Sequence, residues 1–333
     1  MFLLKAVLSK IFKGARRQNA TDIHLTLESN TGLVRVRRRG EMATLCEMTM
    51  EEYRKLVNYL KFTAELDINE HKVPQSGRTV IDDGEISVGV RVSTLPISLM
   101  NEIIVIRILN PMEDRKSMGL FHTGEEYEFL KEYMTRMQGL VLFTGPTGSG
   151  KTTLMYRLLG DIISENKRQI ISIEDPVEYE MDGIVQVEIN EKASMDYSPL
   201  LKGVLRCDPD VIMFGEIRDA KIASELLRAS LSGHLVLSTF HSKSAVSTLS
   251  RLKDYGLYTE EMIQSISLII NQRLIHTNRG SYIIYEYMEN DHIRDYLSGK
   301  KIDIFSLSDQ LDALGKGGSI TETELKTFKS RFK

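Results

Sequence analysis

A glycine-rich segment at residues 145–152 has the residue types and the spacing of a phosphate-binding loop. It reads Gly-Pro-Thr-Gly-Ser-Gly-Lys-Thr and satisfies the pattern G-x-x-x-x-G-K-[ST]. Its glycines let backbone N–H groups turn toward phosphate oxygens, and a helix that follows the loop adds the positive end of its dipole. Lys151 can reach the β- and γ-phosphates, and the hydroxyl of Thr152 can bind Mg²⁺. A glycine turn without a ligand is the alternative, and the expected strand before the loop and helix after it argue against that alternative.

Kinases, switches and motors share such a loop, so other charged residues must identify the reaction. Glu216 follows an apolar strand at 211–214, at the carboxyl end where ligands bind in open α/β sheets. A carboxylate on a strand beside the loop can face Mg²⁺ or the attacking water. Glu216 is therefore a candidate general base, or a residue that orients the water. The alternative is a surface glutamate at a helix start, where the helix dipole favours acids.

Two further strand ends carry polar groups. Glu174, Asp175 and Glu178 lie within five residues, and carboxylates so close repel one another unless a cation balances them. An Mg²⁺-bound nucleotide would supply that cation, and an acidic loop in water is the alternative. His234 and His241 flank another apolar strand. A histidine at a strand tip can donate a hydrogen bond to a phosphate or to a neighbouring subunit, whereas a lone histidine is more often structural.

Two arginines far from the loop are candidates for transition-state charge stabilisation. Motor ATPases use an arginine from another domain or subunit, which approaches the γ-phosphate and couples hydrolysis to movement. Arg78 follows a loop that contains Pro and Gly, and Arg91 lies on the polar face of a strand that alternates valines with small polar residues. Sequence physics alone favours solvated surface residues at both positions.

The elements that position these residues alternate between helices and short apolar strands after residue 125. Short buried strands between helices indicate a parallel, doubly wound sheet, so the fold class is α/β. The expected strands lie at 140–143, 169–173, 184–189, 211–214 and 235–239. The expected helices lie at 125–138, 151–164, 198–206, 219–231, 243–255, 259–271 and 321–332.

The first third of the chain reads as a separate mixed α/β module. Gly40-Glu41 is a turn candidate, and a capping box at 49–52 opens a helix through about Phe62. The alternating strands are expected at 22–27, 32–38, 86–92 and 103–109. The predicted organisation is an N-terminal α/β domain at 1–110, a linker at 111–124, a P-loop core at 125–287 and a helical C-terminal region at 288–333.

The N-terminal segment and the composition bound the class of protein. Apolar residues near the N-terminus recur at helical spacing, which predicts an amphipathic helix that packs on its own domain or, alternatively, binds a membrane or a partner. Lysines interrupt this segment, so a signal peptide is not expected. No apolar run is long enough to span a membrane, and two distant cysteines exclude a disulfide scaffold or a Cys-ligated zinc site. The net charge of −3 argues against direct nucleic-acid binding.

Taken together, these segments resemble the secretion and pilus-assembly ATPases, which comprise type II secretion, type IV pilus and competence motors. The resemblance runs from about residue 19 to residue 276. It includes a Walker A loop, an Asp box, an unusual Walker B segment with G-E-I-R-D, and a His box. The segments that carry it are 20–24, 72–78, 91–96, 145–153, 171–179, 209–220, 233–242 and 271–274.

The resemblance implies a small PAS-like N-terminal domain, a RecA-like P-loop core, and a homohexameric ring with ATP and Mg²⁺ bound between the N-terminal domain and the core. It implies that Arg78 and Arg91 touch the γ-phosphate, that Glu216 serves catalysis, and that His241 senses the nucleotide. The expected catalytic residues are Glu216, Lys151, Arg78, Arg91, Glu174 and His241. The expected nucleotide-binding residues are Gly145, Pro146, Thr147, Gly148, Ser149, Gly150, Lys151, Thr152 and Thr153, with Thr152 also as the metal ligand.

Departures from the family pattern favour one branch of it. No cysteine follows Cys207, so the zinc module of type II secretion members is not expected, and Asp22 falls almost at the start of the chain. This short form without zinc is most similar to the competence pseudopilus ATPases of Gram-positive bacteria. Phe240 and Ser242 replace the usual Leu and Thr of the His box.

The resemblance therefore predicts a cytoplasmic ATPase that works with a membrane platform protein, at the inner face of the cell membrane, and powers fibre assembly for DNA uptake. Three alternatives stay open. The first is a retraction motor of the same fold, and the second is a scaffold that binds ATP without hydrolysing it. The third is a small-molecule kinase, for which the sequence offers no acceptor pocket and no arginine-bearing lid.

Overall fold

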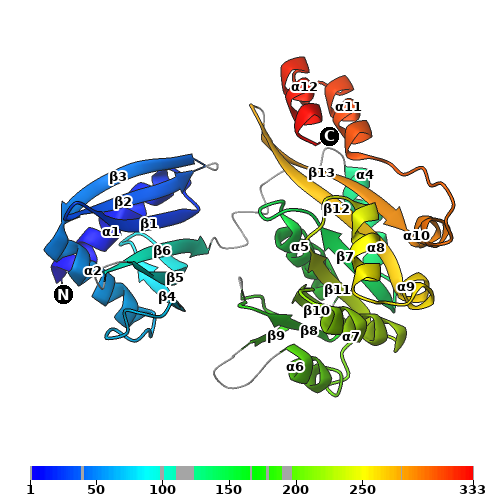
Figure 1. The fold of residues 1–333 in the computed structure, drawn as a ribbon, viewed down its shortest axis with the longest axis horizontal. Coiled ribbons are helices and arrows are strands. Elements are labelled where there is room, and N and C mark those ends of the chain that lie inside the picture. Colours follow the sequence, from blue (N-terminus) through cyan, green and yellow to red (C-terminus); the bar gives the residue numbers. More distant parts are fainter. Residues whose placement is uncertain are drawn as a thin grey trace. The chain divides into compact units, whose positions relative to one another are not determined.

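The computed structural model describes residues 2–38, 41–97, 101–109, 124–165, 167–177, 180–189, 197–278 and 280–332. The chain divides into two compact units, Met1–Asp114 and Arg115–Lys333 (Figure 1). Three predicted features lie outside the described residues: the linker at 111–124 apart from Gly124, the turn residue Gly40, and the acidic residue Glu178.

The first unit is an antiparallel sheet with helices on one face. Its elements are α1 (Phe2–Arg17), β1 (Asp22–Glu28), β2 (Thr31–Arg38), β3 (Glu41–Thr49), α2 (Met50–Thr63), β4 (Gln75–Asp82), β5 (Ser87–Ile97) and β6 (Asn101–Leu109). Within the described residues these strands form a six-stranded sheet in the order β3-β2-β1-β6-β5-β4. Valines and isoleucines of alternate positions pack against α1 and α2, so the opposite face carries the polar positions.

Helix α1 packs on its own unit. Leu8, Ile11, Phe12 and Ala15 are buried in the same cluster as the valines of the sheet. Of the two interpretations of the N-terminal segment, the structure therefore agrees with a helix that packs on its own domain. Helix α2 begins at the predicted capping box, in which Thr49 and Glu52 bond to each other's backbone N–H groups.

Strands β3 and β4 were not predicted from the sequence. None of the described side chains of β3 is fully buried, and Ile81 alone is buried in β4. Without a regular buried position every second residue, these strands lack the alternation that marked their neighbours. They take their structure from pairing with β2 and β5.

The second unit holds the predicted P-loop core and the C-terminal helices. Its elements are α4 (Gly124–Met134), β7 (Gly139–Thr144), α5 (Lys151–Ser164), β8 (Ile170–Glu174), β9 (Val185–Glu188), α6 (Tyr197–Val204), β10 (Val211–Glu216), α7 (Ala220–Leu231), β11 (Leu235–Phe240), α8 (Ala245–Asp254), α9 (Thr259–Ser265), β12 (Ile266–Thr277), β13 (Gly280–Glu289), α10 (Asn290–Leu297), α11 (Leu307–Lys316) and α12 (Glu322–Arg331).

In the described part of this unit the strands form a seven-stranded sheet in the order β13-β12-β7-β11-β10-β8-β9. All neighbours are parallel except β12 and β13. Right-handed crossovers then put α5 on one face of the sheet and α6, α7 and α8 on the other, as Figure 1 shows for α5 and α7. Strands β7 and β11 are neighbours whose connections leave in opposite directions, so a ligand crevice is expected beyond their carboxyl ends.

The predicted helix at 259–271 is wrong in its second half. Helix α9 ends at Ser265, and the chain continues as β12 alongside β7. The run Ile266-Ser-Leu-Ile-Ile is almost uniformly apolar, so periodicity cannot distinguish a buried strand from a buried helix. Pairing on both sides, with β7 and β13, determines the outcome.

The C-terminal helices pack on the second unit. Ile293 and Leu297 of α10 belong to the large hydrophobic cluster formed by the sheet and α6–α9. A separate cluster joins α11 and α12 to Ile275 of β12 and Ile284 of β13.

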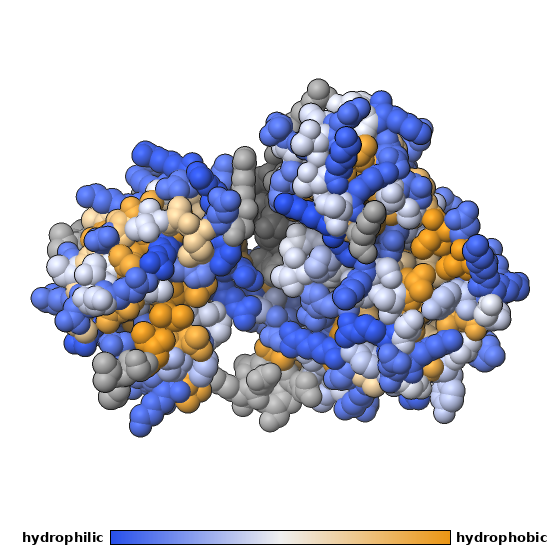
Figure 2. Space-filling model, turned by 45° about the horizontal axis from the view of Figure 1, so that its top comes forward, coloured by the Kyte–Doolittle hydropathy of each residue, from blue (hydrophilic) through white to orange (hydrophobic). Residues whose placement is uncertain are grey.

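The surface is mainly polar. Figure 2 shows hydrophilic side chains over most of the visible face, with apolar patches among them on both units. Among the helices that the structure describes, none combines the length and the hydropathy that a membrane crossing requires.

Candidate nucleotide site

The predicted phosphate-binding loop connects β7 to α5. Gly145, Gly148 and Gly150 have φ angles of +137°, +78° and +84°, a region that favours glycine. A Cβ on Gly145 would lie 2.4 Å from the carbonyl oxygen of Gln272, so this position also needs glycine for space. Gly150 precedes α5 and supplies no side-chain cap, which leaves the first turn of the helix without a side-chain acceptor for its N–H groups. This backbone suits an anion at the start of α5.

Lys151 lies within the loop that it would serve. Its Nζ donates to the carbonyl oxygens of Gly145 and Pro146 at 3.0 and 2.9 Å. The pKa of Lys151 is lowered to about 8, chiefly because the amine is buried; the nearby carboxylate of Glu216 acts in the opposite direction, and the charge of Arg273 adds to the lowering. The loop therefore holds an amine that gains a stronger partner when phosphate oxygens enter.

Nucleotide binding is expected to take up a proton at alkaline pH. Since Lys151 has a pKa of about 8 in the free protein, only about a tenth of these side chains carry a charge near pH 9. Phosphate oxygens favour the charged amine and raise its pKa in the complex. Affinity is therefore highest below pH 8 and falls as the pH rises above this value. Calorimetric titration with ADP near pH 9, in buffers of different ionisation heat, should show uptake of about 0.9 proton per site.

A Lys151→Arg variant is the control, because a guanidinium stays charged at both pH values. It should bind ADP without this uptake. Equal uptake in the wild type and the variant would assign the proton to another group and contradict the prediction.

Glu216 is the last residue of β10, at the same sheet edge as the loop. Its Oε1 lies 3.5 Å from Nε2 of His241, which follows β11, and its Oε2 lies 4.0 Å from Nε of Arg218. The carboxylate is about one-third exposed. Register shifts by one residue after Phe214, where Glu216 pairs with Thr239. The structure thus brings the carboxylate of Glu216 close to the His241 ring and to the charge of Lys151.

Arg218 and Arg251 support this edge, and the sequence analysis assigned a role to neither. Arg218 Nη1 donates to Oδ2 of Asp175 at 2.8 Å and links the loop after β10 to the loop after β8. Arg251 of α8 donates to the carbonyl oxygen of His241 and lies over the ring of Phe240, with its Cζ 4.7 Å from the ring centroid. Arg218 stood in the quoted G-E-I-R-D segment, whereas nothing in the sequence marked Arg251.

The two histidines lie at opposite ends of β11. His241 follows the carboxyl end of β11 and is 42% exposed at its side chain. His234 precedes the amino end of β11, where its Nδ1 lies 2.9 Å from the carbonyl oxygen of Ala229 and 3.1 Å from the hydroxyl of Ser232. His234 therefore bonds to residues at the end of α7, away from the phosphate-binding loop.

Glu174 is buried at the end of β8 and makes three hydrogen bonds. Its carboxylate accepts from Ser172 Oγ at 2.6 Å, from Gln186 Nε2 at 3.2 Å and from the hydroxyl of Tyr156. Tyr156 belongs to α5, so the carboxylate ties the helix that follows the loop to β8 and β9. The neighbouring Asp175 is the acid that points to Arg218.

Strand β12 supports the loop from its other side. Gln272 Nε2 donates to the carbonyl oxygen of Ser149 at 2.8 Å, and Asn271 Nδ2 donates to Thr144 Oγ1 at 2.8 Å. The Ser149 hydroxyl is buried and makes no hydrogen bond with any described residue. An unsatisfied buried hydroxyl inside a glycine loop fits a site that receives phosphate oxygens. Thr152 is the second residue of α5 and directly follows Lys151.

The described residues contain no cluster of three or more His, Cys, Asp or Glu side chains that could hold a metal ion.

The two predicted arginines belong to the first unit and are neighbours there. Arg78 of β4 lies directly opposite Arg91 of β5, and Arg91 lies opposite Arg107 of β6. All three occupy the sheet face away from α1 and α2. Nε of Arg91 donates to Ser76 Oγ at 3.0 Å, and Nε of Arg107 donates to Oδ1 of Asp22 at 3.0 Å. Like charges directly opposite each other repel, so this row favours an anion.

Known proteins are similar to this chain in sequence and in fold. The model of the Type II/IV secretion system protein family matches residues 2–294. Competence protein ComGA of Halalkalibacterium halodurans is 42% identical over 268 residues, which are 80% of this chain and 76% of that protein. Type II secretion system protein E of Pseudomonas aeruginosa is 40% identical over 276 residues, which are 82% of this chain and 53% of that protein. The chain spans about half the length of the type II secretion relatives that it matches.

Two solved structures have the same fold. The ATPase DotB of Legionella pneumophila superimposes with a TM-score of 0.76 at 20% identity and covers 97% of this chain and 95% of that chain. The pilus retraction motor PilT with bound ADP superimposes with a TM-score of 0.72 at 25% identity and covers 96% and 95%. The predicted α/β fold class with a RecA-like core is confirmed. With its sequence matched over most of its length and its fold shared, the chain belongs to the Type II/IV secretion system protein family.

Proposed function

We propose that this protein is a Mg²⁺-dependent ATPase that powers assembly of a competence pseudopilus for DNA uptake. One observation carries the ATPase activity: Glu216, 3.5 Å from His241, lies at the sheet edge that also holds the phosphate-binding loop. A P-loop with a partly exposed carboxylate at this edge can bind a nucleoside triphosphate and orient a water molecule toward it. The competence relative, of which the chain covers 76%, supports the biological assignment.

In the proposed reaction the loop and the start of α5 bind the β- and γ-phosphates. Glu216 orients a water molecule for attack on the γ-phosphate, and His241 lies against the same carboxylate and responds to the nucleotide. Lys151, Arg78 and Arg91 stabilise the negative charge that develops in the transition state. Mg²⁺, bound through Thr152, supplies further charge neutralisation at the β- and γ-oxygens. Glu174 acts through Tyr156, whose helix begins at Lys151.

The assembly that we propose is a homohexamer at the cytoplasmic face of the cell membrane. Its partner is a membrane platform protein of a pilus or secretion machine. We propose no direct nucleic-acid binding, since the net charge is −3. Retraction is the second candidate function, because the pilus retraction motor PilT shares the fold over 96% of this chain.

Steady-state phosphate release, measured together with the mass in solution, tests the proposal. The rate per chain should rise as hexamers form, and Lys151→Ala should abolish it. ATP binding without turnover at any assembly state would favour the non-hydrolysing scaffold. A deletion strain then separates the two directions, because loss of the assembly motor removes fibres and loss of a retraction motor leaves them in excess.

A further inference from the structure

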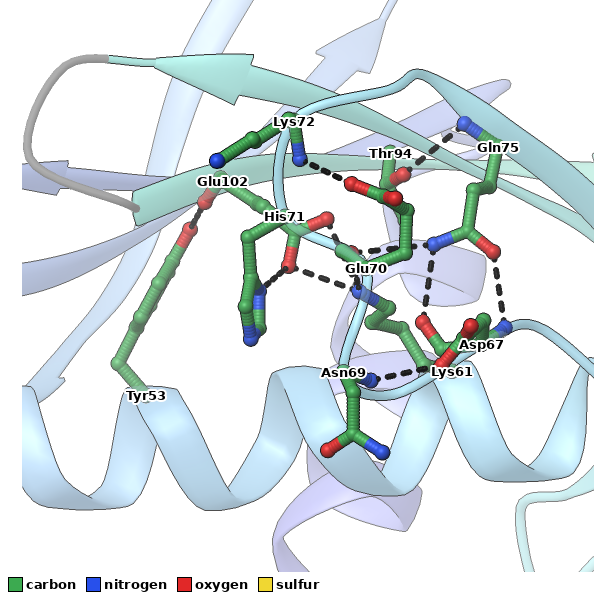
Figure 3. A network of polar contacts seen from close by, with 10 residues as sticks. All are labelled: Tyr53, Lys61, Asp67, Asn69, Glu70, His71, Lys72, Gln75, Thr94 and Glu102. Atoms are coloured by element: carbon green, nitrogen blue, oxygen red, sulfur yellow. Dashed lines mark hydrogen bonds and ion pairs between the residues drawn. The ribbon is translucent and has the colours of Figure 1, made fainter.

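The first unit contains a buried ion pair that no part of the proposed mechanism uses. Lys61 of α2 is 0% exposed and Glu102 of β6 is 3% exposed. Nζ of Lys61 lies 2.9 Å from Oε2 and 3.1 Å from Oε1 of Glu102. Figure 3 shows the two side chains meeting between the helix and the sheet, beside the segment that precedes β4.

Both charges also hold that segment. Nζ of Lys61 donates to the backbone carbonyl of Glu70 at 2.6 Å, and Nδ1 of His71 lies 2.8 Å from Oε2 of Glu102. Because a carboxylate only accepts, the His71 ring donates from Nδ1. Tyr53 of α2 donates its hydroxyl to the backbone carbonyl of Glu102 at 2.5 Å and so fixes the strand behind the pair.

Hydrogen bonds of Gln75 hold the segment that follows α2 in a loop, three residues before Arg78. The side-chain amide of Gln75 donates from Nε2 to the backbone carbonyl of Asp67 at 2.9 Å, and its Oε1 accepts from the backbone N–H of Asp67 at 2.8 Å. The backbone N–H of Gln75 donates to Thr94 Oγ1 on β5 at 3.1 Å. At Gly77 a Cβ would lie 2.2 Å from the carbonyl oxygen of Ala64, so the chain passes in close contact with the end of α2.

Gln75 Nε2 also donates to the Glu70 carbonyl at 3.3 Å, the same oxygen that accepts from Lys61. Hydrogen bonds therefore connect the ion pair to Gln75, three residues before Arg78. Stability alone does not explain the charges, since an apolar pair of similar volume at a buried site is often as stable. Charged groups, unlike apolar ones, bind defined polar atoms. Lys61 binds the carbonyl oxygen of Glu70, and Glu102 binds Nδ1 of His71. An apolar pair would fill the space without selecting one path for the backbone.

We propose that Lys61 and Glu102 are positioning residues for Arg78. They hold residues 66–75 in one path, and this path determines where β4 presents the Arg78 guanidinium opposite Arg91. The inference rests on the proposed function, in which Arg78 stabilises the transition state of ATP hydrolysis. Displacement of a charged group by about 1 Å can cost up to about 10²-fold in rate, so a loosened segment is expected to affect kcat.

The test replaces both charges at once with Lys61→Met/Glu102→Gln in the full chain. Removing one partner leaves the other buried and unpaired, whereas the double variant leaves neither charge and should fold. We expect kcat for ATP hydrolysis to fall about tenfold, while the Kd for ADP stays within about twofold of the wild type, because the phosphate loop is untouched. The matched control is Lys55→Met/Glu51→Gln, an exposed pair on the same helix with 2.5 Å between its charges, which should leave both constants unchanged.

Two measurements keep the inference separate from the proposed function. Arg78→Ala alone must lower kcat; if it does not, the role of Arg78 fails and the inference fails with it. If Arg78→Ala lowers kcat, the Lys61→Met/Glu102→Gln change should cause no further loss in that background. An equal loss in both backgrounds, or full kcat in the double variant, would overturn the inference alone.

Should the double variant fail to fold, His71→Ala tests the same contact from a half-buried position. It removes one bond to Glu102 and should lower kcat about threefold with ADP affinity unchanged. Unchanged kcat in folded His71→Ala protein would then count against the inference.

Discussion

Arg91→Ala and Arg78→Ala are each expected to lower kcat for ATP hydrolysis by about 10³-fold, with little change in ADP affinity. In the sheet of the first unit the two side chains lie directly opposite each other. Two guanidinium groups so placed can both stabilise the negative charge that develops on the transferring phosphoryl group in the transition state. ADP lacks this group, so its binding should not depend on either arginine. Single-turnover phosphate release and ADP titration measure the two effects separately.

The control is Arg35→Ala, on β2 of the same sheet. Arg35 forms a surface ion pair with Glu28 at 2.9 Å, and its loss should change kcat by less than about twofold. If the double variant Arg78→Ala/Arg91→Ala retains the wild-type kcat, neither arginine contributes charge to the reaction. A fall in kcat for Arg35→Ala equal to that of Arg91→Ala would instead indicate a general electrostatic effect of the sheet.

Parts of the fold that local patterns determine could be predicted from the sequence. The apolar strand at 211–214 and the helix at 151–164 each carry a signal within a few residues, and Thr49 with Glu52 marks the start of α2. Strands β3, β4, β12 and β13 were not predicted, because pairing with neighbouring strands of the sheet, and not a local pattern, decides their conformation. An almost uniformly apolar run such as 266–270 has no clear periodicity from which a helix or a strand can be predicted.

The candidate site shows the same division. Lys151, Glu216 and His241 stood in recognisable segments at strand ends, and parallel strands bring such ends to one edge. Arg251 reaches the carbonyl of His241 from a helix that follows it, and Gln272 reaches the loop from 123 residues away. Contacts of this kind depend on the packing of whole elements, so residue type and spacing cannot identify them.

Glu216→Gln is expected to lower kcat by about 10²–10⁴-fold, because an amide cannot accept a proton from water or orient it as a carboxylate does. ATP should still bind at a pH well below 8, where Lys151 carries its charge. The structure also predicts a second effect. The carboxylate of Glu216 raises the pKa of Lys151, so its removal lowers that pKa further below its ordinary value. The pH above which ADP affinity declines should therefore move downward in Glu216→Gln.

These two effects separate catalysis from electrostatics at one residue. His241→Ala is the matched control, because it removes the neighbour of the carboxylate and keeps the charge that acts on Lys151. We expect it to leave the pH dependence of ADP binding as in the wild type. A Glu216→Gln protein with native kcat would end the assignment of Glu216 to the hydrolytic step. Loss of kcat without the downward shift would keep that assignment and show that the carboxylate does not act on Lys151 in solution.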